Sequence, residues 1–173
     1  MDDAHLDRVL IGGRERRAIV IAPYDPAWPR RFLAERERIA AALGGRALRI
    51  EHVGSTSVPG LAAKPIVDIL VEVASLEDAA DLVHAGYVLR VREEGHRMFR
   101  TPELDVHVHV WPSGSPNIAA DLAFRDRLRA SPEDRAAYEA RKRELAAREW
   151  PDMNHYAEAK GPLIREILAR ATG

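Results

Sequence analysis

The hydrophobic positions of this chain change their period several times along its length. Apolar runs rich in β-branched residues, which are typical of strands, occupy residues 18–22, 47–53 and 65–73. Three further strand-like segments, separated by short turns, occupy residues 87–95, 96–102 and 103–111. The first group predicts strands of a small mixed sheet, and the second group predicts an antiparallel meander.

A helical period of 3.6 residues separates the first two of these strands. Pro29 suits a first helical position, and the segment that follows places Phe32, Ile39 and Leu43 on one face before it stops at Gly44. The sequence therefore predicts one amphipathic helix in this segment, with its apolar face toward the sheet.

Helical patterns return later in the chain. Ser75 is a suitable N-cap with Asp78 at the third helical position, which predicts a helix that Gly86 ends. Residues 117–171 carry three successive apolar stripes of helical period. We therefore expect an α+β fold, with a small mixed sheet, flanking helices and a helical C-terminal third.

The length and the pattern together predict a single domain over residues 1–173. Residues 1–16 carry no clear strand or helix pattern, and we expect them to be flexible. The N-terminus lacks the order of a signal peptide, and no apolar run reaches the roughly 20 residues of a spanning helix. We therefore expect a cytoplasmic protein without a membrane partner.

Composition narrows the chemistry further. The sequence contains no cysteine, which excludes disulfides, thiolate metal sites and cysteine nucleophiles. Its 26 basic and 27 acidic residues give a net charge of −1, so it has no overall positive field to attract nucleic acid. Any metal must be bound by histidine, aspartate or glutamate, and nucleic acid is not the expected partner.

A turn of small residues joins the second and third predicted strands. Gly54, Ser55, Thr56 and Ser57 would allow close approach of a ligand and offer amide and hydroxyl groups to phosphate oxygens. The spacing matches neither a P-loop nor a dinucleotide fingerprint, so a plain structural turn is the alternative.

One acid lies inside the apolar run that follows this turn. Asp68 stands in PIVDILV, where an unpaired carboxylate would cost several kcal/mol, in order of magnitude. A cation, a cleft or a hydrogen-bond cluster would remove that cost, and a carboxylate bonded to backbone amides inside the fold is the structural alternative.

Polar residues alternate with valines in the later segment DVHVHV. Asp105, His107 and His109 share one face of the predicted strand, and the two histidines are about 6.6 Å apart at the backbone. They would bind one divalent cation jointly, unless the row is simply a solvated strand face. If the strand with Asp68 lies beside this one, the carboxylate and both imidazoles converge.

Several basic side chains lie in or beside these motifs and are candidates to neutralise phosphate. They are Lys64, Arg97, Arg100, Arg125 and Lys160. The expected ligand is therefore a nucleotide or another small molecule that contains phosphate.

These motifs together resemble the GrpB family over residues 18–168. The resemblance is carried by IVIAPYDPAWPRRFLAERERI, EHVGSTSVPGLAAKPIVDILVEV, DVHVHV, LAFRDRLRASPEDRAAYEARKRELA and YAEAKGPLIREI. It implies a nucleotidyltransferase-like fold, in which a Gly-Ser turn precedes a strand bearing an acid-x-acid pair. In that superfamily the strand acids hold the divalent metals that align a nucleotide triphosphate for in-line attack.

The sequence departs from that pattern at one place. Leu70 stands two residues after Asp68, where the superfamily has its second acid. The strand with Asp105, His107 and His109 corresponds to the later acid-bearing strand, so histidine would replace a carboxylate as metal ligand. Histidine ligands favour manganese, zinc or iron over magnesium. The candidate ions for this site are manganese, zinc or, less favourably, magnesium.

Three functions are compatible with these residues. The first is transfer of a nucleotide from a triphosphate to an unknown acceptor, with Asp68 as the catalytic metal ligand. The second is an inactive module that binds a nucleotide or coenzyme A, because the family also resembles a domain fused to dephospho-coenzyme A kinase in some bacteria. The third is hydrolysis of a phosphoester at a histidine and aspartate metal site.

Overall fold

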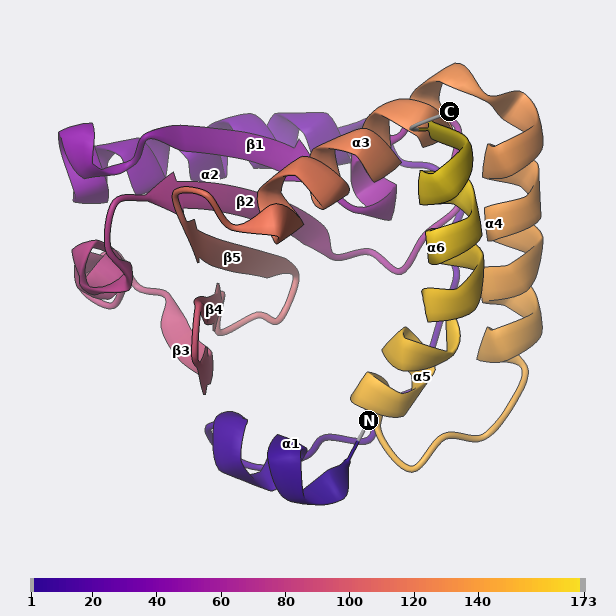
Figure 1. Ribbon diagram of the computed structural model, residues 1–173, viewed down its shortest axis with the longest axis horizontal. Coiled ribbons are helices and arrows are strands. Elements are labelled where there is room, and N and C mark those ends of the chain that lie inside the picture. The colour runs from indigo at the N-terminus through magenta and orange to yellow at the C-terminus, as the bar shows by residue number, and fades with distance from the viewer. Residues whose placement is uncertain (1, 172–173) are drawn as a thin grey trace.

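The computed structural model describes residues 2–171, which form a mixed sheet with helices on both faces and at one end (Figure 1). The five-stranded sheet has the order β1-β2-β5-β4-β3. Its strands are β1 (Arg49–Val53), β2 (Val67–Val73), β3 (Val88–Glu93), β4 (His96–Arg100) and β5 (Val106–Pro112).

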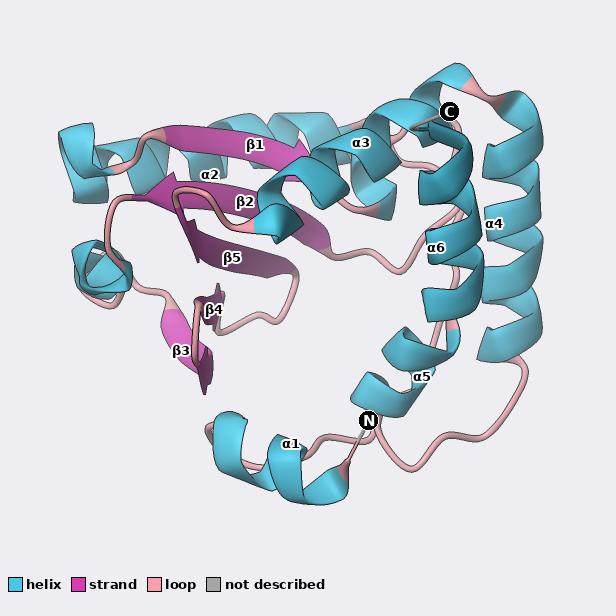
Figure 2. Ribbon diagram, in the orientation of Figure 1, coloured by secondary structure: helices cyan, strands magenta, loops and turns pink. Residues whose placement is uncertain are grey.

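Helices make up most of the rest of the chain, as the colouring of Figure 2 shows. The α-helices are α1 (Asp3–Val9), α2 (Ala27–Leu43), α3 (Pro116–Ala130), α4 (Pro132–Ala146), α5 (Met153–Ala159) and α6 (Gly161–Ala171). Three short 3₁₀ helices are η1 (Gly44–Arg46), η2 (Ser55–Ser57) and η3 (Leu76–Leu82). The predicted α+β fold with a helical C-terminal third is confirmed. None of the helices in residues 2–171 is long and apolar enough to cross a membrane.

The central pair of strands, β2 and β5, is parallel and places Asp68 opposite His107. Strand β1 pairs antiparallel with β2, and β4 lies antiparallel between β5 and β3, so the predicted meander is confirmed. The predicted adjacency of the two strands that carry the polar residues is therefore also confirmed.

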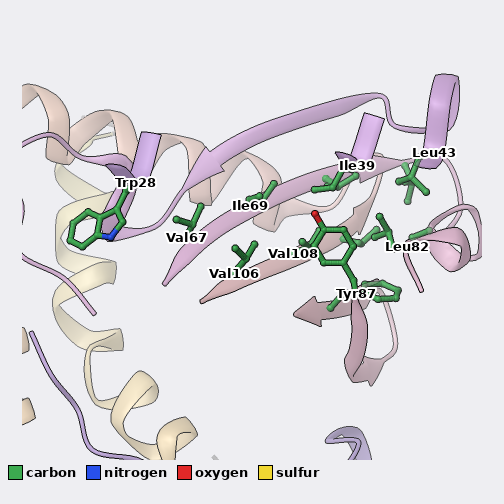
Figure 3. Close-up of a cluster of buried hydrophobic side chains, with 14 of the residues drawn as sticks. Trp28, Ile39, Leu43, Val67, Ile69, Leu82, Tyr87, Val106 and Val108 are labelled. Atoms are coloured by element: carbon green, nitrogen blue, oxygen red, sulfur yellow. The ribbon is translucent and has the colours of Figure 1, made fainter. Parts of the chain in front are cut away.

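Alternation along β2 and β5 gives the sheet two different faces. One face carries the valines and Ile69, and helix α2 covers it with Trp28, Ile39 and Leu43 (Figure 3). Burial of these apolar side chains removes them from water, which is the main favourable term in folding. The other face carries the polar row, and only part of it is sealed by packing.

Helices α4, α5 and α6 stand at one end of the sheet, beyond the turn that follows β1 (Figure 1). Val58 and Leu61 of that turn pack into a separate buried cluster with Leu128, Tyr138 and Ile167. The C-terminal helices are thereby fixed against the loop that leads into Asp68, and their inner side chains face the polar end of the sheet.

Helix α1 lies within residues 1–16, the segment expected to be flexible, and packs beside β3. Leu6 is buried, and the buried Arg90 of β3 donates hydrogen bonds to the carbonyl oxygens of Ile11 and Gly13. An arginine at this buried position needs acceptors, and the N-terminal segment supplies them. A pattern search along the segment alone could not show this long-range requirement.

The expectation of a strand at residues 18–22 is wrong. Only an isolated bridge between Ala22 and Ala63 forms there, because no neighbouring strand is available for a longer ladder. Helix α2 also begins earlier than Pro29, at Ala27, whose amide donates a hydrogen bond to the carboxylate of Asp25 at 2.8 Å.

The predicted capping box of Ser75 and Asp78 is present, but it starts a 3₁₀ helix and not an α-helix. The last predicted helix is two helices, α5 and α6, which meet between Lys160 and Gly161. The break turns α6 back along α4 and leaves Lys160 at the junction.

Candidate functional site

The polar end of the sheet and the C-terminal helices enclose a cavity of about 540 Å³. Its sheet side carries Asp68, His107 and His109, and its helical side carries lysine and tyrosine side chains from α4 and α5. A volume of this size suits a small-molecule ligand. The structure thus gathers most of the predicted site residues around one cavity.

Asp68, His107 and His109 form a compact donor set on the sheet side. The Oδ1 atom of Asp68 lies 3.3 Å from Nε2 of His109 and 3.7 Å from Nδ1 of His107. One oxygen and two nitrogen atoms of the three side chains all lie within 4.8 Å of one another. The parallel register produces this arrangement, because it places residue 68 directly opposite residue 107.

The charges of the three residues depend on one another. Burial lowers the pKa of His107 to about 4, although Asp68 opposes this shift. Burial also lowers the pKa of His109, but the hydrogen bond and charge of Asp68 outweigh it and leave the pKa raised. Burial raises the pKa of Asp68, yet the histidines and Lys64 bring it below its ordinary value. Asp68 and His109 therefore each favour the charged form of the other.

A second layer of side chains orients His109. Nδ1 of His109 lies 3.4 Å from Nε2 of His96, and Nδ1 of His96 lies 2.8 Å from a carboxylate oxygen of Glu93. Since Glu93 only accepts, His96 donates to it and accepts from His109. Trp111 stacks on His96 with ring centroids 3.9 Å apart.

Because Nδ1 of His109 bonds to His96, its Nε2 atom is the one that faces Asp68 and the cavity. A histidine that binds metal commonly donates its other N–H to such a partner, which fixes its ring orientation. Neither residue was predicted from the sequence, although Glu93 directly precedes and His96 directly follows the turn between β3 and β4.

The Gly54 turn holds the carboxylate of Asp68 in place. Gly54 has a φ of 70°, and a Cβ atom built on it would lie 2.6 Å from Oδ2 of Asp68. The positive φ and the close approach both require glycine. The turn thus shapes the site by admitting the acid next to its backbone.

Two residues of the predicted phosphate cradle do not face a ligand. The Thr56 hydroxyl donates to the carbonyl oxygen of Ile66 and lies 3.0 Å from Nε2 of His52, and the Ser57 hydroxyl donates to the carbonyl oxygen of Gly54. Both side chains are buried because the turn is a 3₁₀ helix that points them into the fold. Gly54 and Ser55 are the members that line the cavity.

The helical side of the cavity is basic. Lys64, Lys142 and Lys160 all line it, and burial lowers the pKa of each. The pKa of Lys64 falls to about 8 and that of Lys142 to about 7, with Lys160 as the second cause in both cases. Lys64 and Lys160, two of the candidates to neutralise phosphate, thus line the same cavity as Asp68, and Lys142 joins them there.

Two other predicted residues lie outside this arrangement. Arg100 donates two hydrogen bonds to the carboxylate of Glu15, at 2.9 and 2.7 Å, and does not line the cavity. Asp105 accepts from the Thr101 hydroxyl at 2.7 Å and lies near Arg31 of α2. It precedes the first residue of β5, so the alternation of the strand does not determine its direction.

The position of the missing acid is filled by packing. Leu70 is fully buried and forms a cluster with Val53 and Ile118 of α3. One turn further along α3, Asp121 lines the cavity. Burial raises the pKa of Asp121, with His109 lowering it and Asp68 raising it. Asp121 was missed because the sequence places it on a helix with several other polar residues.

One carboxylate and two imidazoles fit a divalent metal of the first transition row. Nitrogen donors from histidine suit zinc and manganese better than magnesium, which prefers oxygen ligands. The donor atoms need to move closer to one another around an ion, and His109 must release the proton on Nε2. The residues therefore fit one metal ion, and the buried Leu70 stands where the family resemblance implied a second acid.

Comparison with known proteins identifies the family. The family model for GrpB protein matches residues 18–170. A UPF0157 protein of Streptomyces coelicolor is 52% identical over 166 residues, which cover 94% of this chain and 89% of that protein. This chain belongs to the GrpB family. The crystal structure of conserved protein GrpB from Enterococcus faecalis is 31% identical with a TM-score of 0.77, and the match covers 89% of this chain and 100% of that one.

A longer relative of this GrpB-family chain is a dephospho-CoA kinase of Mycolicibacterium paratuberculosis. It is 33% identical over 189 residues, which cover 90% of this chain but 46% of that protein. In this chain the turn at Gly54 and Ser55 leads into β2 with Asp68, and β5 lies beside β2.

Replacing Gly54 by alanine tests how the turn supports the site. The Gly54→Ala variant should lose about 1–3 kcal/mol of unfolding free energy and most of its affinity for zinc, because the new methyl group displaces the Asp68 carboxylate. Urea unfolding and zinc titration calorimetry measure the two effects. Gly45→Ala is the matched control, since nothing lies within 4 Å of its Cβ position. Equal zinc affinities for the two variants would contradict this role.

The buried lysine predicts a dependence of stability on pH. The pKa of Lys142 is about 7 in the folded protein and 10.5 ordinarily, so between these values the unfolded chain binds more protons. The unfolding free energy should therefore rise with pH from 7 to 9.5. The Lys142→Met variant should show a shallower rise, with Lys64 supplying the remainder in the same direction. Urea unfolding at pH 7, 8 and 9.5 gives the slopes, and identical slopes would refute the assignment.

Proposed function

We propose that this GrpB-family chain is a cytoplasmic, metal-dependent nucleotidyltransferase-like protein that acts on a nucleotide triphosphate and an unknown acceptor. The observation that carries the proposal is the position of Asp68, His107 and His109 on one side of a cavity whose other side is lined by lysines. A metal donor set beside a basic wall is the combination that phosphoryl chemistry needs.

Each residue has a defined task in this proposal. Asp68, His107 and His109 hold one divalent ion, and His96 keeps His109 in orientation. The chemistry that such an ion supplies is polarisation of a phosphoryl oxygen and neutralisation of charge. Ser55 and the backbone at Gly54 line the cavity beside Asp68 and contact phosphate oxygens.

The proposed reaction is a displacement at the α-phosphorus of the triphosphate. A hydroxyl oxygen of the acceptor forms a new bond to this phosphorus, and the bond to the bridging oxygen breaks. Pyrophosphate leaves with the bonding electrons, and the lysine wall offsets its charge. The proton of the acceptor passes to Asp121, which lines the same cavity and forms no ion pair within residues 2–171.

A binding module without turnover is the second candidate. Its support is Leu70, which fills the position of the second superfamily acid and is sealed in the core by Ile118. Such a module would bind a nucleotide or coenzyme A as an accessory part, as the length of the dephospho-CoA kinase relative suggests for that protein. It predicts ligand binding without product.

Metal titration tests the first step of the proposal. Chelator-treated protein should bind one manganese or zinc ion in calorimetry, and bind magnesium more weakly. Asp68→Asn and His107→Ala should each weaken binding by more than the 10–100-fold that is typical when only an outer partner of a metal ligand is changed. His84→Ala is the control, because its side chain is 86% exposed and lies away from the cavity.

Turnover then separates the candidate functions. Pyrophosphate release from a nucleotide triphosphate in the presence of manganese and a pool of small-molecule acceptors supports nucleotidyl transfer. Nucleotide or coenzyme A binding without product supports the accessory module. Steady phosphate release without an acceptor supports a phosphohydrolase. Failure of the wild type to bind any of the three metals, with or without nucleotide, would overturn the metal-dependent proposal.

A further inference from the structure

The lysines of this chain have an uneven distribution. The sequence contains lysine at positions 64, 142 and 160 only, and every other cationic side chain apart from histidine is arginine. These lysines come from the segment before β2, from α4 and from the end of α5, yet all of them line the same cavity. Distant parts of the chain thus supply the same residue type to one place.

The charges of Lys64 and Lys160 lack partners. Within residues 2–171, neither ammonium group forms an ion pair or a side-chain hydrogen bond. Their Nζ atoms lie 5.1 and 5.0 Å from the centre of the Tyr156 ring. A cation held over an aromatic face gains some energy, but much less than desolvation of its charge costs. Both side chains are partly buried, so an anion would remove an unfavourable state.

Tyr156 adds a hydrogen-bond donor without a partner. Its side chain is fully buried and lines the cavity, and its hydroxyl oxygen has no hydrogen bond among the described residues. A buried hydroxyl that makes no bond costs about 1–3 kcal/mol. Because the ring that carries this hydroxyl also lies beside the ammonium groups of Lys64 and Lys160, the three groups together point to an acceptor ligand.

Lys142 completes the basic wall. It is only 2% exposed, lies 5.1 Å from the centre of the Tyr138 ring and donates a hydrogen bond to the carbonyl oxygen of Ala62. The neighbouring Glu139 is already engaged by Arg143 and by the amide of Ala62. Three ammonium groups therefore converge without a carboxylate committed to them.

We propose that Lys64, Lys142, Lys160 and the Tyr156 hydroxyl form a binding site for linked phosphates, which is occupied without any metal. Three ammonium groups match the charge of pyrophosphate or a longer phosphate chain better than that of a single phosphate. Lysine suits the task because a compact ammonium approaches phosphate oxygens as a point charge and loses its proton more readily than arginine when the site is empty.

The identity of the phosphate-bearing ligand, a nucleotide triphosphate, rests on the proposed function. The lysine site adds the orientation of that ligand in the cavity. The charge of Asp68 acts on both Lys64 and Lys160, so the lysine wall adjoins the metal side of the cavity. The β- and γ-phosphates would lie on the lysines, with the α-phosphate toward Asp68. Pyrophosphate would then leave from the wall that already neutralises it.

Tripolyphosphate in the presence of chelator tests the site without the metal. Calorimetry should show binding to the wild type, and inorganic phosphate should bind at least about tenfold more weakly. Lys64→Gln and Lys160→Gln should each weaken tripolyphosphate binding by about 10–100-fold, as expected for loss of a charge-assisted hydrogen bond. Arg36→Gln removes one exposed positive charge from α2 and should leave binding unchanged.

Tyr156→Phe separates binding from folding. The variant loses only the unpaired hydroxyl, so it should be at least as stable as the wild type in urea and yet bind tripolyphosphate about 3–10-fold more weakly. Protein labelled with ¹³C at lysine Cε should give three resonances, all of which should shift with tripolyphosphate. Shifts at fewer than three lysines would refute the assignment.

The outcomes distinguish this site from the proposed function. Metal-free tripolyphosphate binding that depends on the lysines supports the site even if no metal ion binds to Asp68 and the histidines. Absence of tripolyphosphate binding, equal binding of inorganic phosphate, or equal losses in Arg36→Gln would overturn it, whatever the metal titration shows.

Discussion

The parallel pairing of β2 with β5 is the constraint on which the site depends. It sets Asp68 beside His107 and one pleat away from His109, so that a carboxylate and two imidazoles meet without any loop having to fold over them. The pairing is secured from the opposite face, where the valines and Ile69 of both strands pack under α2. A slip by one residue would bury the histidines and expose that apolar face.

Burial shifts the pKa values of charged groups on both sides of the cavity. Against the effect of burial on both groups, the hydrogen bond between Asp68 and His109 raises the pKa of His109 and lowers the pKa of Asp68. On the helical side, burial and then the charge of Lys160 lower the pKa values of Lys64 and Lys142. The two walls of the cavity thus carry complementary chemistry: one offers a carboxylate and two imidazoles, and the other offers lysine ammonium groups. In the proposed function, a metal complex of a phosphate ligand would contact both walls.

The sequence alone predicts much of this arrangement, because strand alternation and an acid in an apolar run are local signals. The polar row at His107 and His109 and the isolated Asp68 required only their neighbours to be recognised. Thr56, Ser57 and Arg100 were assigned to phosphate from residue type, but their hydrogen bonds depend on the conformation of the turn and on Glu15, which is distant in sequence.

Other members of the site depend on tertiary structure. Lys142 and Tyr156 lie on helices whose exposed faces are also charged, and only the packing of α4, α5 and α6 against the turn turns them inward. His96 belongs to a strand that reads as an ordinary member of the meander, and its role follows from its stacking on Trp111 and His109. For Leu70, the sequence shows that an apolar residue stands in place of an acid. Only the structure shows that this side chain packs against Ile118 of α3.

The central claim is that Asp68, His107 and His109 bind one metal ion. Anomalous diffraction at the zinc edge, from crystals grown with a single equivalent of zinc, tests it most directly. The account predicts one strong peak among these side chains, about 2.0–2.2 Å from a carboxylate oxygen of Asp68, Nδ1 of His107 and Nε2 of His109. A peak only at other histidines, with the pairing of Asp68 and His109 undisturbed, would contradict it.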